Sequence, residues 1–266
     1  MSRKVFVILA VMTLVLVTVI PVTAITYGEP DEDGHPYVGL VVFDDAEGPA
    51  WRCSGTLLSP TVFLTAGHCT DGAVAARIWF ESEVTDPAYP FGGGTSVEAA
   101  EIHTHPGWDW FATFPNTSDL GIVILEEEVN LDEYGALLEI GVLDELATRR
   151  GLQDIIVRTV GYGLQEVRPF LRIELVRYTA TSMIVNLRSA LTDGYNLHTS
   201  NNPGQGQGTG GSCFGDSGGP IFYPEDSNMV VAVVSFGLNA NCKGADFGYR
   251  TDIENARAFI LPFLEE

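Results

Sequence analysis

A serine lies among glycines in the last quarter of the chain, in the segment Cys213-Phe214-Gly215-Asp216-Ser217-Gly218-Gly219-Pro220. Glycine permits a tight backbone turn, which could direct two backbone N–H groups towards one point. Such a pair of donors stabilises the oxyanion that forms when a nucleophile attacks a carbonyl group. The segment therefore predicts nucleophilic catalysis by Ser217.

The order of residues along the chain decides which serine motif this is. Gly215 to Gly219 also fits the G-x-S-x-G motif of α/β-hydrolases, in which the catalytic histidine follows the serine. All five histidines precede Ser217, and they are His35, His68, His103, His105 and His198. A histidine base must therefore come from upstream, and the α/β-hydrolase motif is excluded.

Two upstream segments could supply the base and a carboxylate. Leu64-Thr65-Ala66-Gly67-His68-Cys69 follows an apolar run, and Thr117-Ser118-Asp119 directly precedes another. A half-buried carboxylate is costly unless it is hydrogen-bonded, and an imidazole N–H would satisfy it. His103-x-His105 alone is a weak metal signal, because no C-x-x-C or H-x-x-x-H spacing accompanies it. No metal site and no cofactor are predicted.

The three segments, in the order His68, Asp119 and Ser217, resemble the chymotrypsin/trypsin-like serine proteases. Val160 to Gly163 is similar to the Gly-aromatic-Gly strand of that family, and Ser235 to Gly237 to its substrate-pairing strand. The resemblance implies an all-β fold of two six-stranded antiparallel β-barrels with a C-terminal helix. It also implies an active site in the cleft between the barrels.

The resemblance implies a role for each catalytic residue. Ser217 would attack the scissile carbonyl, His68 would take its proton and pass it to the leaving amine, and Asp119 would hold the imidazole tautomer. The N–H groups of Gly215 and Ser217 would form the oxyanion hole. A non-catalytic binding protein with the same fold is the main alternative. The presence of all three triad residues favours the enzyme, a serine endopeptidase acting on protein or peptide substrates.

The resemblance also locates the pocket for the substrate's P1 side chain. Gly211, six residues before Ser217, stands where a trypsin-type aspartate would lie, so an apolar or small P1 residue is predicted. The pocket's far wall lies in Asp246-Phe247-Gly248-Tyr249, where three alternatives remain. Phe247 would favour small P1 residues, Gly248 large apolar ones, and Asp246 Arg or Lys. The residues expected to bind substrate are Gly211, Ser212, Phe214, Ser235, Phe236 and Gly237.

The amino terminus reads as a secretory signal peptide, residues 1–24. A basic start at Arg3 and Lys4 precedes an apolar run from Val5 to Ile20, with small residues before Ile25. An uncleaved membrane anchor is the alternative, but the run is shorter than the roughly 20 residues that a spanning helix needs. Cleavage after Ala24 would give a secreted, extracellular protein with no membrane attachment.

By resemblance, a new amine at Ile25 would pair with the aspartate before the nucleophile, Asp216, and so form the oxyanion hole. The sequence after the cut, Ile25-Thr26-Tyr27-Gly28, matches the family's Ile-Val-Gly-Gly only at its first and fourth positions. No propeptide is expected between Ala24 and Ile25. Signal cleavage would then release the active form directly.

The four cysteines of a secreted chain predict two disulfides, for which three pairings exist. Their spacing favours Cys53–Cys69 and Cys213–Cys242, which close short loops. The chain's net charge of −21 becomes −23 without residues 1–24, because that segment carries two basic and no acidic residues. Such an acidic protein is a poor partner for nucleic acid. A monomer is expected.

The mature chain consists of apolar and β-branched runs separated by turn residues, and this pattern predicts β structure. Residues 25–140 are expected to form the first barrel and residues 141–266 the second. Helices are expected at 143–150 and 254–264, and a surface loop at 200–211. The predicted strands are Tyr37 to Phe43, Val74 to Phe80, Leu120 to Leu125, Ile155 to Gly161 and Met229 to Phe236.

Overall fold

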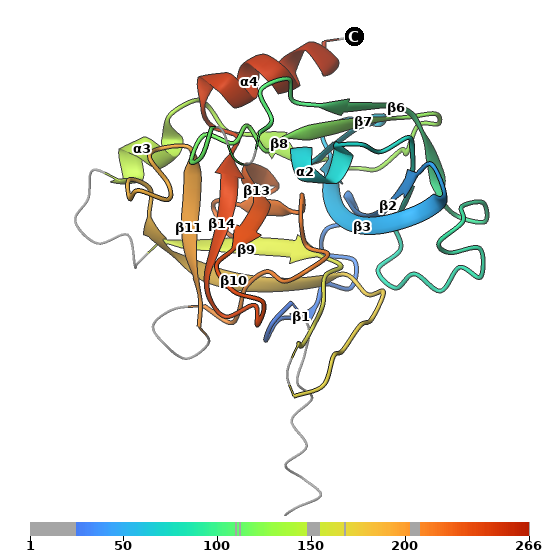
Figure 1. Cartoon of the computed structure of the whole chain (residues 1–266), viewed down its shortest axis with the longest axis horizontal. Coiled ribbons are helices and arrows are strands. Elements are labelled where there is room, and N and C mark those ends of the chain that lie inside the picture. Colours follow the sequence, from blue (N-terminus) through green and yellow to red (C-terminus); the bar gives the residue numbers. More distant parts are fainter. Residues whose placement is uncertain are drawn as a thin grey trace, which may run out of the picture.

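The computed structural model describes residues 25–109, 111, 113–147, 155–167, 169–202 and 208–265. Two β-barrels pack against each other, the first coloured blue to green and the second yellow to red (Figure 1). The predicted signal peptide lies outside the described residues, as do parts of the predicted loop at 200–211 and of the predicted helix at 143–150.

Six antiparallel strands close the first barrel, in the spatial order β2–β3–β4–β7–β6–β5. Apolar residues fill it, since every residue of β4 and most of β2 and β7 are buried. The strands are β2 (Val38–Asp45), β3 (Gly48–Leu57), β4 (Val62–Thr65), β5 (Ala75–Trp79), β6 (Val97–Thr104) and β7 (Gly121–Leu125).

The second sheet follows the order β10–β11–β14–β13–β12–β9, and pairing of β9 with β10 closes it as a six-stranded barrel. Two short strands add to it: β1 (Glu29–Pro30) pairs with β10, and β8 (Ala136–Leu137) runs parallel to β13. The barrel strands are β9 (Ile156–Gly161), β10 (Tyr178–Asn186), β11 (Asn196–Asn201), β12 (Pro220–Phe222), β13 (Met229–Gly237) and β14 (Gly244–Arg250). The predicted two-barrel fold is thus confirmed.

Helices are few. α2 (Gly67–Thr70) is a single turn after β4, and α3 (Val142–Ala147) lies where the sequence predicts a short helix. The predicted terminal helix consists of α4 (Glu254–Ile260) followed by a 3₁₀ turn, Leu261–Phe263. Pro262 contributes to that change because it has no N–H for an α-helical hydrogen bond. No helix in the described ranges is long and apolar enough to cross a membrane.

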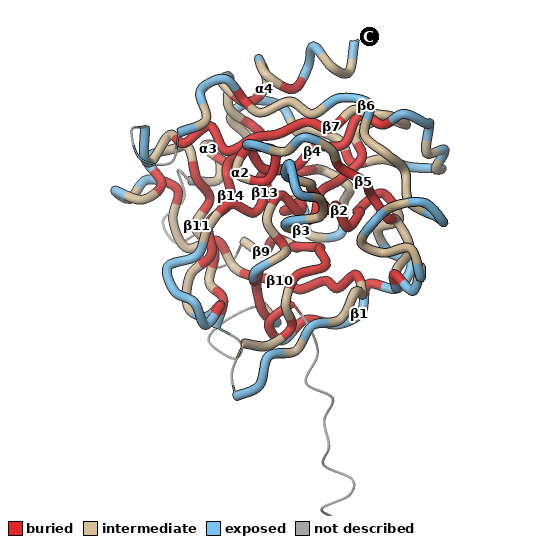
Figure 2. The backbone as a smooth tube through the Cα atoms, turned by 45° about the vertical axis from the view of Figure 1, so that its right-hand side comes forward, coloured by how far each residue is buried: buried red, intermediate tan, exposed pale blue. Residues whose placement is uncertain are grey.

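One hydrophobic cluster joins the barrels. It contains first-barrel residues such as Phe43 and Phe63 together with Tyr162, Phe222 and Tyr249 of the second. Figure 2 shows this arrangement as buried strands surrounded by exposed loops. The two barrels thus share part of their hydrophobic core.

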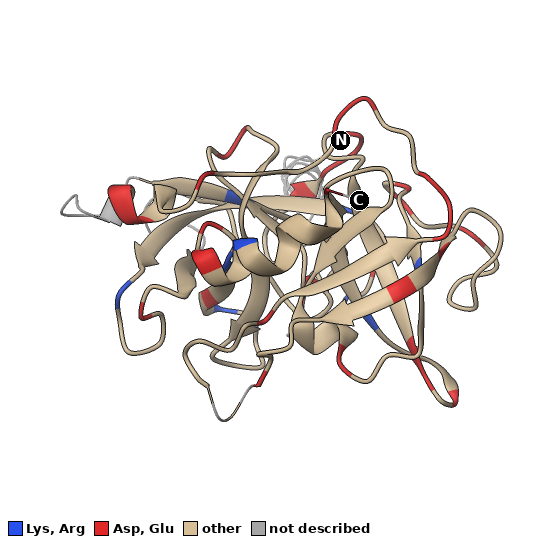
Figure 3. Cartoon of the chain, turned by 90° about the horizontal axis from the view of Figure 1, so that it is seen from above, with Lys and Arg blue, Asp and Glu red and all other residues tan. Residues whose placement is uncertain are grey.

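Acidic residues far outnumber basic ones along the chain, and many of them lie on loops (Figure 3).

A buried arginine also ties the two barrels together. Arg177, directly before β10, is only 1% exposed, and its Nε donates to the Asp31 carboxylate at 2.8 Å. Its Nη1 donates to the backbone oxygens of Val38 and Phe80, in and just after first-barrel strands, at 3.2 and 3.0 Å. Because a buried charge must be paired and hydrogen-bonded, these contacts oppose any sliding of one barrel over the other.

Candidate active site

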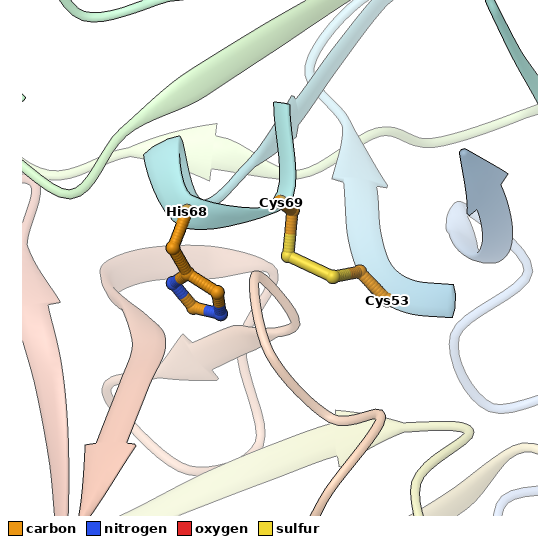
Figure 4. Close-up of side chains that lie close together, drawn as sticks. All are labelled: Cys53, His68 and Cys69. Atoms are coloured by element: carbon orange, nitrogen blue, oxygen red, sulfur yellow. A yellow bond between two sulfur atoms is a disulfide. The ribbon is translucent and has the colours of Figure 1, made fainter. Parts of the chain in front are cut away.

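His68 lies on the single helical turn α2, and two contacts hold that turn in place. Cys69 forms the predicted disulfide with Cys53 on β3, with Cα atoms 6.4 Å apart. The Trp51 indole donates to the Cys69 carbonyl at 2.8 Å. Figure 4 shows the imidazole beside this disulfide. The two Cys sulfurs and a His68 ring nitrogen lie within 4.8 Å of one another, but the sulfurs are consumed by the disulfide and are not free thiolates for a metal.

Asp119 is fully buried two residues before β7, and its oxygens accept hydrogen bonds from three donors. His68 contributes two, its backbone N–H at 2.8 Å from Oδ1 and its Nδ1 at 2.9 Å from Oδ2. Ser235 on β13 contributes its hydroxyl, 2.5 Å from Oδ2. The sequence predicted Ser235 as substrate-binding but did not predict this bond. The carboxylate therefore fixes both the position and the tautomer of the imidazole, with hydrogen on Nδ1.

The electrostatics of His68 suit a base. Burial by itself lowers its pKa, but the charge of Asp119 and its hydrogen bond outweigh burial and raise the pKa above its ordinary value. The indole of Trp108 lies beside the ring, tilted by 44°, with centroids 6.1 Å apart. Because Nδ1 is bound to Asp119, Nε2 is the nitrogen left for proton transfer.

The predicted nucleophile turn has the backbone that its glycines allow. Gly215 has φ of +97° and Gly218 of +76°, a region that favours glycine. A Cβ on Gly218 would collide with the Thr65 hydroxyl. Within the described part of the chain, the N–H groups of Gly215 and Ser217 donate no hydrogen bond. Both donors are thus available to a ligand.

A cavity of about 560 Å³ joins this turn to the predicted specificity pocket. His68 and Ser217 line it together with Asp246 and Lys243. Five of the six predicted substrate-binding residues also line it: Ser212, Phe214, Ser235, Phe236 and Gly237. The structure thus brings the predicted triad and the predicted pocket into one site.

Gly211 does not line the cavity itself, because Asp246 lies against it. A Cβ on Gly211 would meet the Asp246 carboxylate, whose Oδ2 accepts a hydrogen bond from the Ser212 N–H at 2.6 Å. Phe247 points elsewhere, stacked between Phe236 and His198 with centroids 4.5 and 4.6 Å away. Of these three residues, Asp246 lines the cavity, and Phe247 and Gly248 do not.

The Asp246 carboxyl is only 6% exposed. Burial raises its pKa to about 6, against the hydrogen bonds from Ser212 and Asn201, which lower it. The cavity is thus lined by a buried acid whose pKa is raised by burial.

The model of the trypsin family matches residues 26–260. The chain belongs to the trypsin family. It is 25% identical to brachyurin of Leptuca pugilator over 78% of this chain and 84% of that protein. It is 26% identical to chymotrypsin-C of Bos taurus over 81% and 79% of the two chains. A solved structure of HL collagenase superposes with a TM-score of 0.68 at 18% identity, covering 90% of this chain and 98% of that one, which supports the fold. The protein is a serine endopeptidase of this family, with protein or peptide substrates.

The floor of the pocket in this trypsin-family enzyme rests on two residues that sequence reasoning missed. Thr26 pairs with Gly211 as an isolated antiparallel bridge, and its hydroxyl lies 3.1 Å from the Gly211 carbonyl. The fully buried Asn201 amide donates to the carbonyls of Ser212 and Cys242 at 3.1 and 2.9 Å. Cys242 is joined to Cys213 as predicted. The sequence predicted Asn201 within the surface loop 200–211, which is wrong for this residue, because the structure places it fully buried at the end of β11.

Ile25 and Asp216, the predicted activation pair, are both fully buried. Ile25 packs beside Tyr178 and Ala180 of β10. Because Ala24 precedes Ile25 in this chain, the Ile25 nitrogen is an amide. Asp216 accepts hydrogen bonds from the N–H groups of Gly163 and Cys213 at 2.7 and 2.9 Å. Burial raises the pKa of Asp216 to about 7 despite those bonds.

Proposed function

We propose that this endopeptidase cleaves peptide bonds with Ser217 as nucleophile, His68 as general base and acid, and Asp119 as the group that orients His68. The observation that carries the proposal is the 2.9 Å bond from His68 Nδ1 to a fully buried Asp119, in a histidine that shares a cavity with Ser217. A buried acid placed on one imidazole nitrogen makes the other nitrogen the proton acceptor.

The reaction follows from these positions. His68 Nε2 removes the Ser217 proton as Oγ attacks the scissile carbonyl. The resulting oxyanion lies between the N–H groups of Gly215 and Ser217, which have no other partner among the described residues. His68 then gives the proton to the leaving amine, and water hydrolyses the acyl-enzyme by the reverse sequence.

Labelling with a fluorophosphonate tests this proposal directly. The mature protein should take up one equivalent of probe, and peptide mapping should find it on Ser217, because only an activated serine reacts. The His68→Ala variant should label far more slowly under the same conditions. A folded mature protein that takes up no probe would favour a binding protein on this fold, and label on another residue would reject the assignment.

We also propose that Asp246 sets the P1 preference. The cavity is lined by apolar residues such as Val234 and Phe236 and by the acidic Asp246. Because an ionised carboxylate requires a partner when buried, a basic P1 side chain would satisfy it. A protonated Asp246 would instead leave a pocket suited to uncharged side chains. This gives the basic specificity a physical basis, whereas the prediction of apolar or small residues rests on Gly211.

The preference should therefore depend on pH. Asp246 loses its proton as pH rises through about 6, so the ratio of kcat/KM for Arg to that for Leu at P1 should increase over that range. Taking the ratio cancels the titration of His68. An Asp246→Asn variant keeps the shape and the acceptor for Ser212 but should lower the ratio about ten- to hundred-fold, the value of a hydrogen bond to a charged group. It should also abolish the pH dependence.

Peptides that differ only at P1, assayed between pH 5 and 8, provide the measurement. Ser182→Ala is a matched buried control, because Ser182 lies on β10 and its hydroxyl has no partner within the described residues. If Asp246→Asn leaves the Arg-to-Leu ratio unchanged, the apolar or small preference predicted from Gly211 becomes the better hypothesis.

We further propose that the enzyme acts outside the cell as a monomer. Support comes from the signal-like sequence of residues 1–24 and from two disulfides, which persist in oxidising compartments. Sedimentation of the purified mature protein at micromolar concentration should give a single species near the mass of one chain. A stable dimer would contradict the monomer.

A further inference from the structure

Ser54 is a buried residue of β3 that the proposed mechanism does not use. It lies in the first barrel, directly after Cys53, and is 0% exposed. All of its polar groups are hydrogen-bonded, and three of the four bonds reach segments of the second barrel. A serine whose every polar group is engaged across an interface requires an explanation beyond filling space.

The bonds of Ser54 reach both residues proposed for the oxyanion hole. Its backbone N–H donates to the Ser217 carbonyl at 2.8 Å. Its hydroxyl donates to the Gly215 carbonyl at 2.9 Å. The hydroxyl oxygen accepts from the Tyr162 N–H, also at 2.9 Å, and the Ser54 carbonyl accepts from the Thr65 hydroxyl at 2.8 Å.

These contacts restrain the rotations that aim the oxyanion donors. Gly215 has φ of +97° and no side chain, so its backbone is intrinsically free to rotate. The hydrogen bond from Ser54 to the Gly215 carbonyl restricts rotation of the Gly215–Asp216 peptide, which lies between the two peptides that carry the donor N–H groups. Ser54 also holds the Ser217 carbonyl, on the other side of the Ser217 N–H. Oxyanion donors contribute most when they are fixed before the reaction begins. The Tyr162 N–H in turn fixes the orientation of the Ser54 hydroxyl.

We infer that Ser54 is a positioning residue, whose hydroxyl holds the oxyanion hole of Gly215 and Ser217 in its working geometry from the opposite barrel. The inference rests on the proposed function of those two residues. Ser54 touches neither the substrate nor the reacting atoms, so its effect should appear in the stabilisation of the transition state and not in ground-state binding.

The Ser54→Ala variant tests the inference because it removes the hydroxyl and adds no atom. Its kcat per titrated active site should fall about ten- to hundred-fold, less than the effect of deleting an oxyanion donor outright. KM for an amide substrate should stay within about twofold. The affinity for a substrate-like peptide aldehyde, whose adduct places an oxyanion in the hole, should fall by the same factor as kcat.

Two further variants separate geometry from folding. Ser54→Gly also lacks the hydroxyl and should show the same loss of kcat and of aldehyde affinity. Ser182→Ala, a buried serine of β10 whose hydroxyl has no partner in the described ranges, should leave both unchanged. Thermal melting and fluorophosphonate titration give the folded fraction, so rates refer only to reactive enzyme.

The outcomes are distinguishable. Parallel losses of kcat and aldehyde affinity at constant KM support the inference. It is overturned if kcat per active site is unchanged in Ser54→Ala, if kcat falls while aldehyde affinity does not, or if only Ser54→Gly is impaired, which would show packing alone. Full activity in Ser217→Ala would instead reject the proposed nucleophile, independently of the Ser54 result.

Discussion

Replacing Ser217 by alanine should lower kcat for peptide hydrolysis by about a million-fold while the protein remains folded. The substitution removes only the hydroxyl that acts as nucleophile in the proposed mechanism. His68→Ala should cost about as much, because the two residues act as a unit in proton transfer. Ser217→Ala combined with His68→Ala should therefore be scarcely worse than either alone.

Asp119→Asn should have a smaller but still large effect, about ten-thousand-fold. An amide at this position can donate to Nδ1 and so favours the wrong tautomer of His68. The acid limb of the pH profile should also change, because Asp119 is what raises the pKa of His68. Removing that charge lets burial lower the pKa, so residual activity should persist to lower pH.

Steady-state assays on a peptide amide, with active-site titration and melting curves for each variant, provide the measurement. Ser182→Ala serves again as the matched buried control. Ser217→Ala or His68→Ala retaining near wild-type kcat/KM, in protein free of contaminating protease, would contradict the triad.

Adding one residue before Ile25 should nearly abolish activity without unfolding the protein. The proposed active form places the Ile25 ammonium against Asp216, and the extension moves that charge away by one residue. Asp216 is fully buried and neighbours the nucleophile in the chain, so an unpaired carboxylate there disfavours the working turn. We expect at least a hundred-fold loss of kcat/KM, comparable to the loss of an oxyanion donor.

The pH dependence of stability should separate the two forms. In the extended chain, burial raises the pKa of Asp216 from 3.8 to about 7. As pH rises, Asp216 therefore loses its proton at a lower pH in the unfolded state than in the folded state. The stability of the extended chain should consequently fall as pH rises from about 4 to 7. Pairing with the ammonium of the mature form should reduce this loss.

The amine has the opposite dependence. Pairing raises its pKa above the free value of about 7.7–8.0, so its stabilisation is complete below that value and is lost as pH rises through the folded-state pKa. The mature enzyme should therefore lose activity on the alkaline side. Melting curves and kcat/KM from pH 4 to 10, for protein beginning at Ile25 and for the extended form, provide the measurement. Equal activities, or a secreted N-terminus well downstream of Ile25, would end the hypothesis.

The sequence by itself determined the family and the fold. The segments around His68, Asp119 and Ser217 are short. Their chemistry depends on local residue types and on the order of the three segments, and both are visible in the sequence. The five predicted strands correspond to β2, β5, β7, β9 and β13, because apolar runs between turn residues report burial directly. The two disulfides followed from cysteine spacing. The pairing of Ile25 with Asp216 and the barrel boundary at residue 140 remain predictions.

Only the tertiary structure decided the pocket and its supports. Asp246 and Gly211 are far apart in sequence, and the register of β14 against β11 and β13 determines whether Asp246, Phe247 or Gly248 faces the cavity. A shift of one residue would reverse that choice, because successive strand residues point to opposite faces. The role of Ser54 likewise depends on the packing of one barrel against the other. Cross-strand register and barrel contact join residues that local sequence patterns cannot relate.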